Sequence, residues 1–140
     1  MNSFTRKILY LSLLLIMSTS LHASIYIIVS NKSNISSIST SKLKQAYLGK
    51  LVSASGRTLQ PVEYASSNPL QKAFTQSIIR LNTSLLMQYR SRLIFSGKGR
   101  LPRKVGSQSA MLSVVARSPS AIGFVSKKPS TSAVKVIKTL

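Results

Sequence analysis

The side chains in this sequence best suited to chemistry are hydroxyls and an amide that surround a predicted helix start. Ser66, Ser67 and Asn68 come directly before Pro69, and proline in the first helical position after an asparagine cap is a strong start signal. The first N–H groups of a helix lack acceptors and lie at the positive end of its dipole, so this segment is a candidate anion site. The alternative is that Asn68 only caps its helix while both serines are solvated.

A second candidate segment follows the first predicted strand and contains Ser36 and Ser37. Ligands of open α/β sheets bind beyond the carboxyl ends of strands. We therefore expect the two serine-containing loops to converge on one anion, with Lys98 at the rim of the site. Serine-rich loops are also common without a ligand, so the interpretation as a plain loop stays open.

The composition excludes most enzyme chemistry. The 140 residues include 20 Lys or Arg, one acidic residue, one His and no Cys. Metal sites, thiol chemistry and paired-carboxylate catalysis need side chains that are scarce or missing here, so we expect no enzyme activity, no metal and no cofactor. Glu63, the only acid, is expected to pair with a cation rather than to accept a proton from a ligand.

Two short matches to catalytic or nucleotide-binding motifs carry little weight. Ser41 and Lys44 fit the S-x-x-K pattern of some serine hydrolases, but the chain is rich in serine and has no second motif of that class. Residues 96–100 are rich in glycine and cations but lack the GxxxxGK(S/T) spacing of a phosphate-binding loop. We interpret that loop as a hinge or a cationic rim.

The first 23 residues have the parts of a secretory signal peptide. Arg6 and Lys7 precede the largely apolar run 8–17, and Ala23 follows a polar stretch at the expected cleavage point. A membrane span needs roughly 20 apolar residues, which this run does not reach; an uncleaved anchor extended by residues 25–29 is the alternative. We expect residues 1–23 to be removed and residues 24–140 to form one domain in the periplasm or otherwise outside the cytoplasm.

Alternating strand and helix patterns predict an α/β domain. Strands are expected at residues 24–30, 58–64, 121–125 and 134–138, the first one buried and the second at a sheet edge because Pro61 cannot donate to a ladder. Residues 96–104 are expected to be a loop. Four polar residues are suitable helix N-caps: Ser39, Asn68, Asn82 and Ser107.

The spacing of apolar side chains predicts the buried face of each helix. Gly49 suits the left-handed position after the first helix. The expected buried residues of the first three helices are Leu43, Ala46, Tyr47, Leu70, Ala73, Phe74, Ile78, Leu81, Leu85, Leu86, Tyr89 and Leu93.

Five segments in a fixed order resemble the short phosphate-binding-protein-like family. They are Tyr47-Leu-Gly-Lys50, Pro61-Val-Glu63, Ser67-Asn-Pro-Leu-Gln-Lys-Ala-Phe74, Leu93-Ile-Phe-Ser-Gly-Lys-Gly99 and Ala121-Ile-Gly-Phe-Val125. This family is related to the type 2 periplasmic solute-binding proteins of phosphate ABC transporters, which are about twice as long and close two lobes on a ligand. The chain departs from the family pattern at Glu63-Tyr64, at Ser67-Asn68, at Gln71 and at Arg90.

The resemblance implies a single abbreviated type 2 periplasmic-binding-protein-like domain, with a short mixed sheet flanked by about four helices. It also implies a non-catalytic, exported protein that binds a small oxyanion, plausibly phosphate. An ABC transporter permease is the partner that the resemblance implies. The ligand-binding residues expected for this function are Ser36, Ser37, Ser66, Ser67, Asn68 and Lys98.

The net charge supports an alternative function. A formal charge of +19 attracts polyanions such as nucleic acid, anionic lipid or lipopolysaccharide. Lys72, Arg80, Arg90 and Arg92 are expected to place cations on several helical faces rather than in one tail. The alternative is thus a basic polyanion-binding envelope protein that keeps the fold without the ligand site.

Overall fold

A computed structural model describes residues 23–140. Its strands are β1 (Tyr26–Ser30), β2 (Ser53–Ala54), β3 (Arg57–Thr58), β4 (Gln60–Tyr64), β5 (Arg103–Val105), β6 (Ala121–Val125) and β7 (Val134–Thr139). Its helices are α2 (Thr40–Tyr47), α3 (Pro69–Phe74), α4 (Thr83–Phe95) and α5 (Gln108–Arg117), and the π-helical turn η1 (Thr75–Ile79) continues α3. The predicted signal peptide lies outside the described residues, apart from Ala23.

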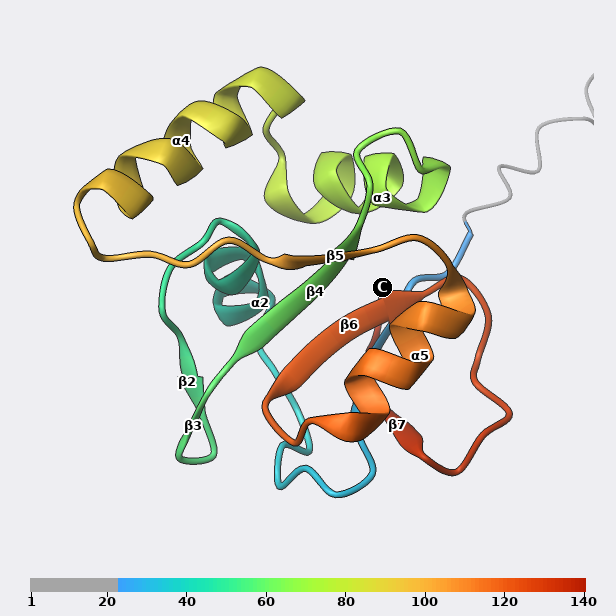
Figure 1. Cartoon of the computed structure of the whole chain (residues 1–140). Coiled ribbons are helices and arrows are strands. Elements are labelled where there is room, and N and C mark those ends of the chain that lie inside the picture. Colours follow the sequence, from blue (N-terminus) through green and yellow to red (C-terminus); the bar gives the residue numbers. More distant parts are fainter. Residues whose placement is uncertain (1–22) are drawn as a thin grey trace, which may run out of the picture.

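The main sheet is mixed and has the strand order β5-β4-β6-β1-β7 (Figure 1). Strands β5, β4 and β6 are parallel, whereas β1 pairs antiparallel with both β6 and β7. The short strands β2 and β3 form a separate hairpin. The predicted α/β architecture, with a short mixed sheet and four α-helices among the described residues, is confirmed.

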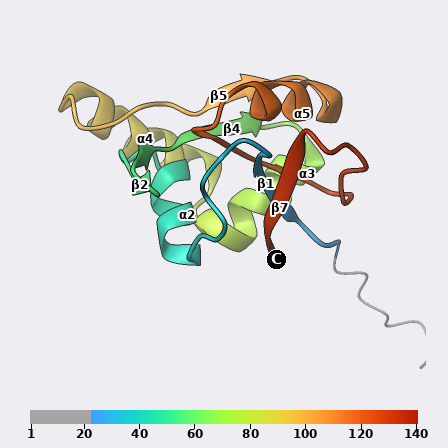
Figure 2. The same ribbon diagram turned by 90° about the horizontal axis from the view of Figure 1, so that it is seen from below.

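Helices cover both faces of this sheet. Helix α5 lies on one face, and α2 and α3 lie on the other (Figure 2). The central strands β1 and β6 are therefore almost completely buried, which explains why residues 26–30 and 121–125 are apolar runs rather than alternating patterns. Helix α4 extends away from the sheet (Figure 1).

Four aromatic rings form the centre of the core between the sheet and helices α2 and α3. Phe124 of β6 stacks on Phe74 of α3 with ring centroids 4.0 Å apart. Tyr47 of α2 packs edge-on against both rings, and Tyr64 of β4 packs edge-on against Phe124. Such offset and edge-on arrangements are the favourable geometries for aromatic pairs.

All four predicted N-caps are confirmed. Ser39 accepts a hydrogen bond from the Lys42 amide, and Asn68 accepts from the amides of Leu70 and Gln71. Asn82 caps α4 through the Leu85 amide, and Ser107 caps α5 through the Ala110 amide. Gly49 follows α2 with φ +101°, as its left-handed position requires.

The predicted edge position of residues 58–64 is wrong. Strand β4 lies between β5 and β6, although Gln60 and Pro61 pair only with β6 because β5 begins opposite Val62. The lack of an N–H group at Pro61 therefore removes no hydrogen bond between β4 and β5. Residues 96–104 are likewise not all loop, because Arg103 and Lys104 belong to β5.

Two predicted core residues are exposed. Helix α3 buries Gln71 and Phe74, so Ala73 lies off this face and outside the core. The π-helical turn that follows brings both Ile78 and Ile79 inside. Leu85 is 48% exposed because α4 extends beyond the sheet, so one turn of its apolar face has nothing to pack against. No helix within residues 23–140 combines the length and the hydropathy needed to cross a bilayer.

Candidate functional site

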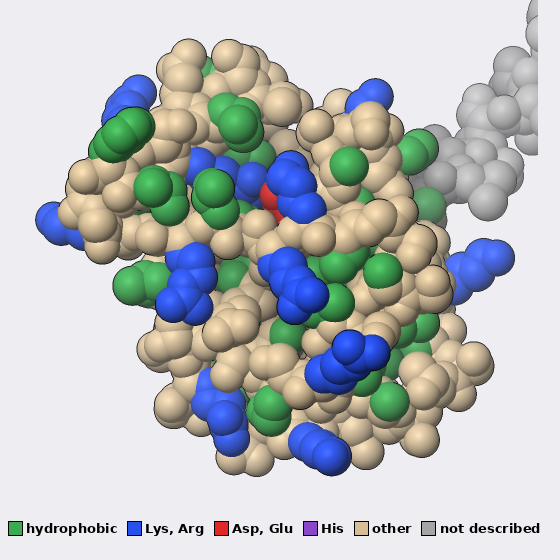
Figure 3. Space-filling model, viewed as in Figure 1, with side chains coloured by type: hydrophobic (Ala, Val, Ile, Leu, Met, Phe, Trp, Pro, Cys, Tyr) green, Lys and Arg blue, Asp and Glu red, His purple; other side chains and the backbone are tan. Residues whose placement is uncertain are grey.

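A cavity of about 440 Å³ opens at the carboxyl ends of β4 and β5. Its walls come from the strand ends and from α3, η1 and the first turns of α4. Figure 3 shows a hollow on this side of the molecule in which a small acidic patch lies among Lys and Arg side chains. The polar residues that line the cavity include Glu63, Ser66, Gln71, Lys72, Thr75, Asn82, Thr83, Arg90 and Lys104.

A buried ion pair forms the floor of the cavity. Arg90 Nη1 and Nη2 donate to Glu63 Oε1 and Oε2 at 3.0 and 2.9 Å, so the pairing is bidentate. Arg90 is 4% exposed and Glu63 is 2% exposed. The expectation that Glu63 pairs with a cation is therefore confirmed. The expectation that Arg90 is a surface cation is wrong.

Each partner of this ion pair is held by a second element. Arg90 Nε and Nη2 donate to the Tyr47 carbonyl at the end of α2, at 3.2 and 2.7 Å. Gln71 of α3 donates to Glu63 Oε2 at 3.4 Å and accepts from the Tyr64 amide at 2.9 Å. Within residues 23–140, every buried side-chain nitrogen and oxygen has a hydrogen-bond partner. The network is thus fully satisfied, as a buried polar cluster must be to be tolerated.

Two tyrosine hydroxyls extend this polar network into the core. Tyr47 Oη lies 2.9 Å from the Val62 carbonyl and 3.1 Å from the Ile122 carbonyl, and Tyr64 Oη donates to the Phe124 carbonyl at 2.9 Å. Burial, and then the negative charge of Glu63, raise the pKa of Tyr47 well above its usual value. Burial raises the pKa of Tyr64 to about 12. Both phenols therefore act as neutral donors at ordinary pH.

The mouth of the cavity carries two exposed lysines. The Lys104 side chain is 58% exposed, and its Nζ lies 3.6 Å from Glu63 Oε1. Lys72 is also exposed and lines the same cavity. Because Arg90 neutralises Glu63, these two lysines leave the site with a net positive charge.

Of the predicted site residues, Ser66 lines this cavity, whereas Ser67 and Asn68 do not. The Asn68 side chain is used to cap α3. The Leu70 and Gln71 amides donate to it, the Lys72 amide donates to the Asn68 carbonyl, and Pro69 has no N–H. The start of α3 therefore keeps no free amide for an anion, so the capping interpretation of Asn68 is the one that the structure supports.

The expected convergence of the two serine loops is wrong. Because β1 runs antiparallel to β6 and β4 runs parallel to it, the chain leaves β1 and β4 at opposite ends of the sheet. Ser36 and Ser37 are exposed in the loop after β1, away from Ser66. Lys98 lies beyond the carboxyl end of α4, whereas the residues of that helix that line the cavity end at Arg90.

Arg90, Lys104 and Thr83 are site residues that the sequence did not reveal. One signal was present for Arg90, which lies four residues after the buried Leu86 and so shares its helical face. No local pattern indicates Lys104, whose place depends on the pairing of β5 with β4.

The segments that carry the family resemblance meet around this network. The Gly49 carbonyl, next to Tyr47, accepts from the Arg100 amide at 2.9 Å, and Lys50 forms a bridge with Gly99. A Cβ on Gly99 would lie 2.7 Å from Leu93 Cβ and 2.8 Å from the Gly49 carbonyl oxygen, so glycine is needed for this contact. These motif residues thus hold α2 against α4 and position Arg90.

The sequence and the structure of the chain were compared with those of known proteins. No family model and no curated protein sequence matches the chain. Among solved structures, the chain is similar to an ABC-type phosphate transport receptor from Vibrio cholerae, with a TM-score of 0.62 and 18% identity over 83% of this chain and 47% of the receptor. It is also similar to a protein from Clostridium perfringens, crystallised with bound phosphate and assigned as a phosphate ABC transporter substrate-binding protein (TM-score 0.60, 14% identity, 83% of this chain and 45% of that one).

A third similar structure is PstS from Borrelia burgdorferi, with a TM-score of 0.53 and 14% identity over 74% of this chain and 41% of that one. The chain spans about half the length of these receptors. At such identities the likeness concerns the fold. The chain therefore has a phosphate-binding-protein-like fold, over an extent that corresponds to about half of a phosphate-transport receptor.

Proposed function

We propose that this protein is an exported, non-catalytic solute-binding-like protein for a small oxyanion, with phosphate as the first ligand to test. The observation that carries the proposal is the cationic cavity at the carboxyl ends of β4 and β5, in a fold shared with phosphate-transport receptors. Parallel strands of open sheets place ligands at this end. Cleavage after Ala23, a location in the periplasm and association with an ABC transporter permease complete the proposal.

The cavity offers three kinds of donor to an oxyanion. Lys72 and Lys104 supply charge, and charge-assisted hydrogen bonds are roughly twice as strong as neutral ones. Ser66 supplies a hydroxyl. The first turn of α4 supplies amides, because Asn82 caps only Leu85 and the N–H groups of Thr83 and Ser84 precede the first bond within the helix.

The buried ion pair keeps the floor of the cavity compatible with an anion. An unpaired carboxylate at Glu63 would repel phosphate, but its two oxygens are engaged by Arg90 and Gln71. The positive potential of the remaining surface adds to the attraction at long range.

Calorimetric titration with phosphate at physiological ionic strength tests this proposal. Lys72→Gln/Lys104→Gln removes the two exposed cations of the cavity, and we expect it to weaken phosphate binding at least tenfold, since each lost charge-assisted bond is worth about 1.5–3 kcal/mol. Lys127→Gln/Lys128→Gln is the matched control, because it removes two exposed cations from the loop between β6 and β7. Equal binding by both variants would exclude this cavity.

The second candidate function is non-specific polyanion binding by the envelope protein. The distribution of exposed charge favours it, because cations are spread over the whole visible face in Figure 3 and the only acid is buried. Affinity for short DNA or lipopolysaccharide that falls steeply between about 50 and about 200 mM salt would support this candidate. Phosphate binding that persists over this range would support the first.

A further inference from the structure

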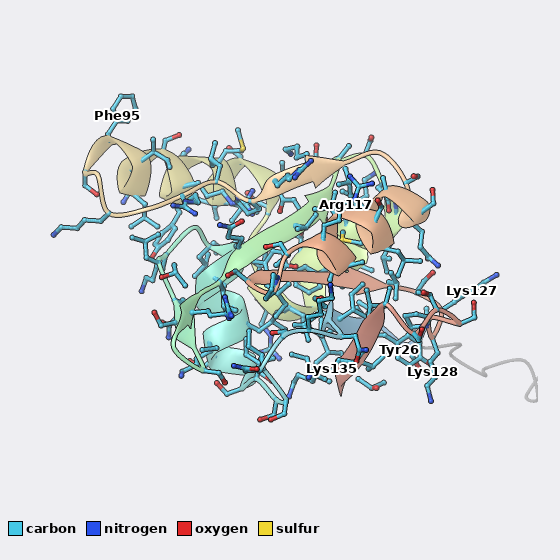
Figure 4. The ribbon with its side chains drawn as sticks, turned by 60° about the horizontal axis from the view of Figure 1, so that its bottom comes forward. Tyr26, Phe95, Arg117, Lys127, Lys128 and Lys135 are labelled. Atoms are coloured by element: carbon cyan, nitrogen blue, oxygen red, sulfur yellow. The ribbon has the colours of Figure 1, made fainter. Side chains whose placement is uncertain are left out.

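The carboxyl end of α4 presents apolar side chains to solvent. Phe95 is 92% exposed and Ile94 is 41% exposed. Figure 4 shows Phe95 projecting from the end of the helix, away from the rest of the protein. Single exposed apolar residues are common, so Phe95 becomes informative only where other exposed apolar residues lie beside it.

Two neighbouring loops add to this apolar surface. Leu51 and Leu101 are each 57% exposed. Their segments are joined next to the helix end, because the Arg100 amide donates to the Gly49 carbonyl, Lys50 forms a bridge with Gly99, and the Lys98 amide donates to the Leu93 carbonyl. We call the surface formed by Leu51, Ile94, Phe95 and Leu101 the α4 tip.

Exposed cations surround the α4 tip. They are Lys50, Arg92, Lys98 and Arg100. No acidic side chain offsets them, since Glu63 is the only one in the chain and it is buried in the ion pair with Arg90. Apolar and cationic side chains are therefore interspersed at this end of the molecule, as Figure 3 shows on the left.

We propose that the α4 tip docks on the surface of an anionic lipid bilayer, with Phe95 and its aliphatic neighbours entering the acyl boundary and the four cations contacting lipid headgroups. Peripheral membrane binding combines these two contributions, apolar insertion and attraction to anionic lipid. This contact is separate from the cavity at the other end of α4, so it does not rest on the proposed oxyanion site.

Charge and side-chain type favour a bilayer over the other occupants of such a surface. A second copy of this chain would bring cations against cations with no carboxylate to offset them. Single-stranded nucleic acid is bound by several stacked aromatic rings, whereas three of the four apolar residues here are aliphatic. Aliphatic side chains match a hydrocarbon environment.

A tryptophan probe tests this contact directly, because none of the 140 residues is tryptophan. Phe95→Trp places one probe at the α4 tip, and Leu85→Trp places a matched probe at the exposed start of the same helix. Vesicles of phosphatidylcholine with about 30% phosphatidylglycerol supply the anionic surface. We expect a blue shift and quenching by brominated acyl chains for Trp at position 95, and neither for Trp at position 85. Equal quenching of both probes, or of neither, would overturn the proposal.

Charge variants provide the second measurement. Lys98→Gln/Arg100→Gln is expected to lower partition into the same vesicles by an order of magnitude or more, since each cation at the surface contributes about fivefold. Lys127→Gln/Lys128→Gln removes two exposed cations at the opposite end of the molecule in Figure 4 and is expected to change partition less than twofold. Equal losses of vesicle binding from the two variants would overturn the proposal and indicate non-specific adsorption. The same conclusion would follow if the unmodified protein bound single-stranded DNA as tightly as it bound the vesicles.

Discussion

Glu63 and Arg90 form an ion pair in which both side chains are almost completely buried, and this pairing accounts for the burial of the only acidic residue in so basic a chain. Desolvating two charges is costly, so a buried pair adds little to stability, whereas removing one partner leaves the other uncompensated. The bidentate geometry and the extra bonds from Gln71 and to Tyr47 satisfy both groups. The pair therefore defines how β4, α2, α3 and α4 fit together.

Replacing Arg90 should be far more damaging than replacing the other cation at Glu63. We expect Arg90→Met to lower the free energy of unfolding by about 3–5 kcal/mol, because a buried carboxylate loses its bidentate partner. Lys104→Met removes an exposed cation from the same carboxylate and should cost less than about 1 kcal/mol. Chemical denaturation of both variants measures the difference, and comparable losses would contradict the assignment of Arg90 as the principal partner.

The buried tyrosines predict a loss of stability at alkaline pH. Their folded pKa values lie above the usual value of 10.0, to about 12 for Tyr64, so the neutral form is favoured in the folded state. The resulting stabilisation is complete below about pH 10 and is lost as the pH rises toward the folded pKa, by up to about 1.4 kcal/mol per pH unit for each phenol. Denaturant midpoints between pH 9 and 12 measure it.

Tyr64→Phe is the control for this pH dependence. The substitution removes one of the two titrating phenols together with its hydrogen bond to the Phe124 carbonyl. The variant should therefore be less stable at pH 7, but its stability should fall less steeply above pH 10. An unchanged slope would show that Tyr64 does not contribute.

At the residue scale, the sequence predicts what depends on near neighbours. Asn68 was predicted to cap a helix because Pro69 and a helical pattern follow it, and the structure confirms this cap. The burial of Arg90 could not be predicted in this way, because its partner Glu63 lies 27 residues away on a strand. Ser66 was predicted from the helix start at Pro69 and lines the cavity, whereas Lys104 is in place only through strand pairing.

At the scale of elements, Gly123 controls how closely α5 packs on the sheet. A Cβ at this position would lie 2.5 Å from Met111 Sδ and 2.9 Å from Val115 Cγ2, both on the face of α5 that covers β6. The glycine in the segment Ala121-Ile-Gly-Phe-Val125 is therefore explained by close packing rather than by ligand binding.

Gly123→Ala is expected to destabilise the protein by about 1–3 kcal/mol, the usual cost of overpacking a core. Gly106→Ala is the matched control, because a Cβ there would meet no atom within 4 Å. Thermal or denaturant unfolding of both variants measures the cost. Met111→Ala should partly rescue Gly123→Ala by making room for the new methyl group, and an additive loss would argue against this packing explanation.

Helices and strands with an apolar pattern in their own sequence were predictable, whereas strands that form only by pairing with a neighbouring strand were not. The strands at 26–30, 121–125 and 134–139 and the capped helices have strong local signals. Strand β5 begins with Arg103 and Lys104, which are exposed, so only its pairing with β4 makes it a strand. The π-helical turn after Phe74 has no local signal in the sequence, and it changes which residues after Phe74 are buried.

At the scale of the whole molecule, the relative directions of β1 and β4 determine whether the loops that follow these strands lie close together. The motif order predicted the fold, and similarity to phosphate-transport receptors confirms it. The direction of β1 relative to β4 depends on how the chain crosses the sheet, which no local pattern reveals. Because β1 is antiparallel to its neighbours, Ser36 and Ser37 lie at the end opposite to Ser66, and the candidate site is built from α3, η1 and α4 instead.

The same long-range arrangement places the two proposed functions on different parts of α4. Its residues from Thr83 to Arg90 contribute to the cavity, and its last two residues, Ile94 and Phe95, belong to the α4 tip. A substitution at Phe95 should therefore leave phosphate binding unchanged.

Titration of phosphate into the isotope-labelled protein, followed through the chemical shifts of its backbone amides, is the most direct test of the oxyanion site. At physiological ionic strength we predict saturable shifts concentrated at Ser66, Thr83, Ser84 and Lys104. Shifts that are absent, that do not saturate, or that lie mainly around Ser36 and Ser37 or around Lys127 and Lys128 would contradict the placement of a phosphate-binding site in this cavity.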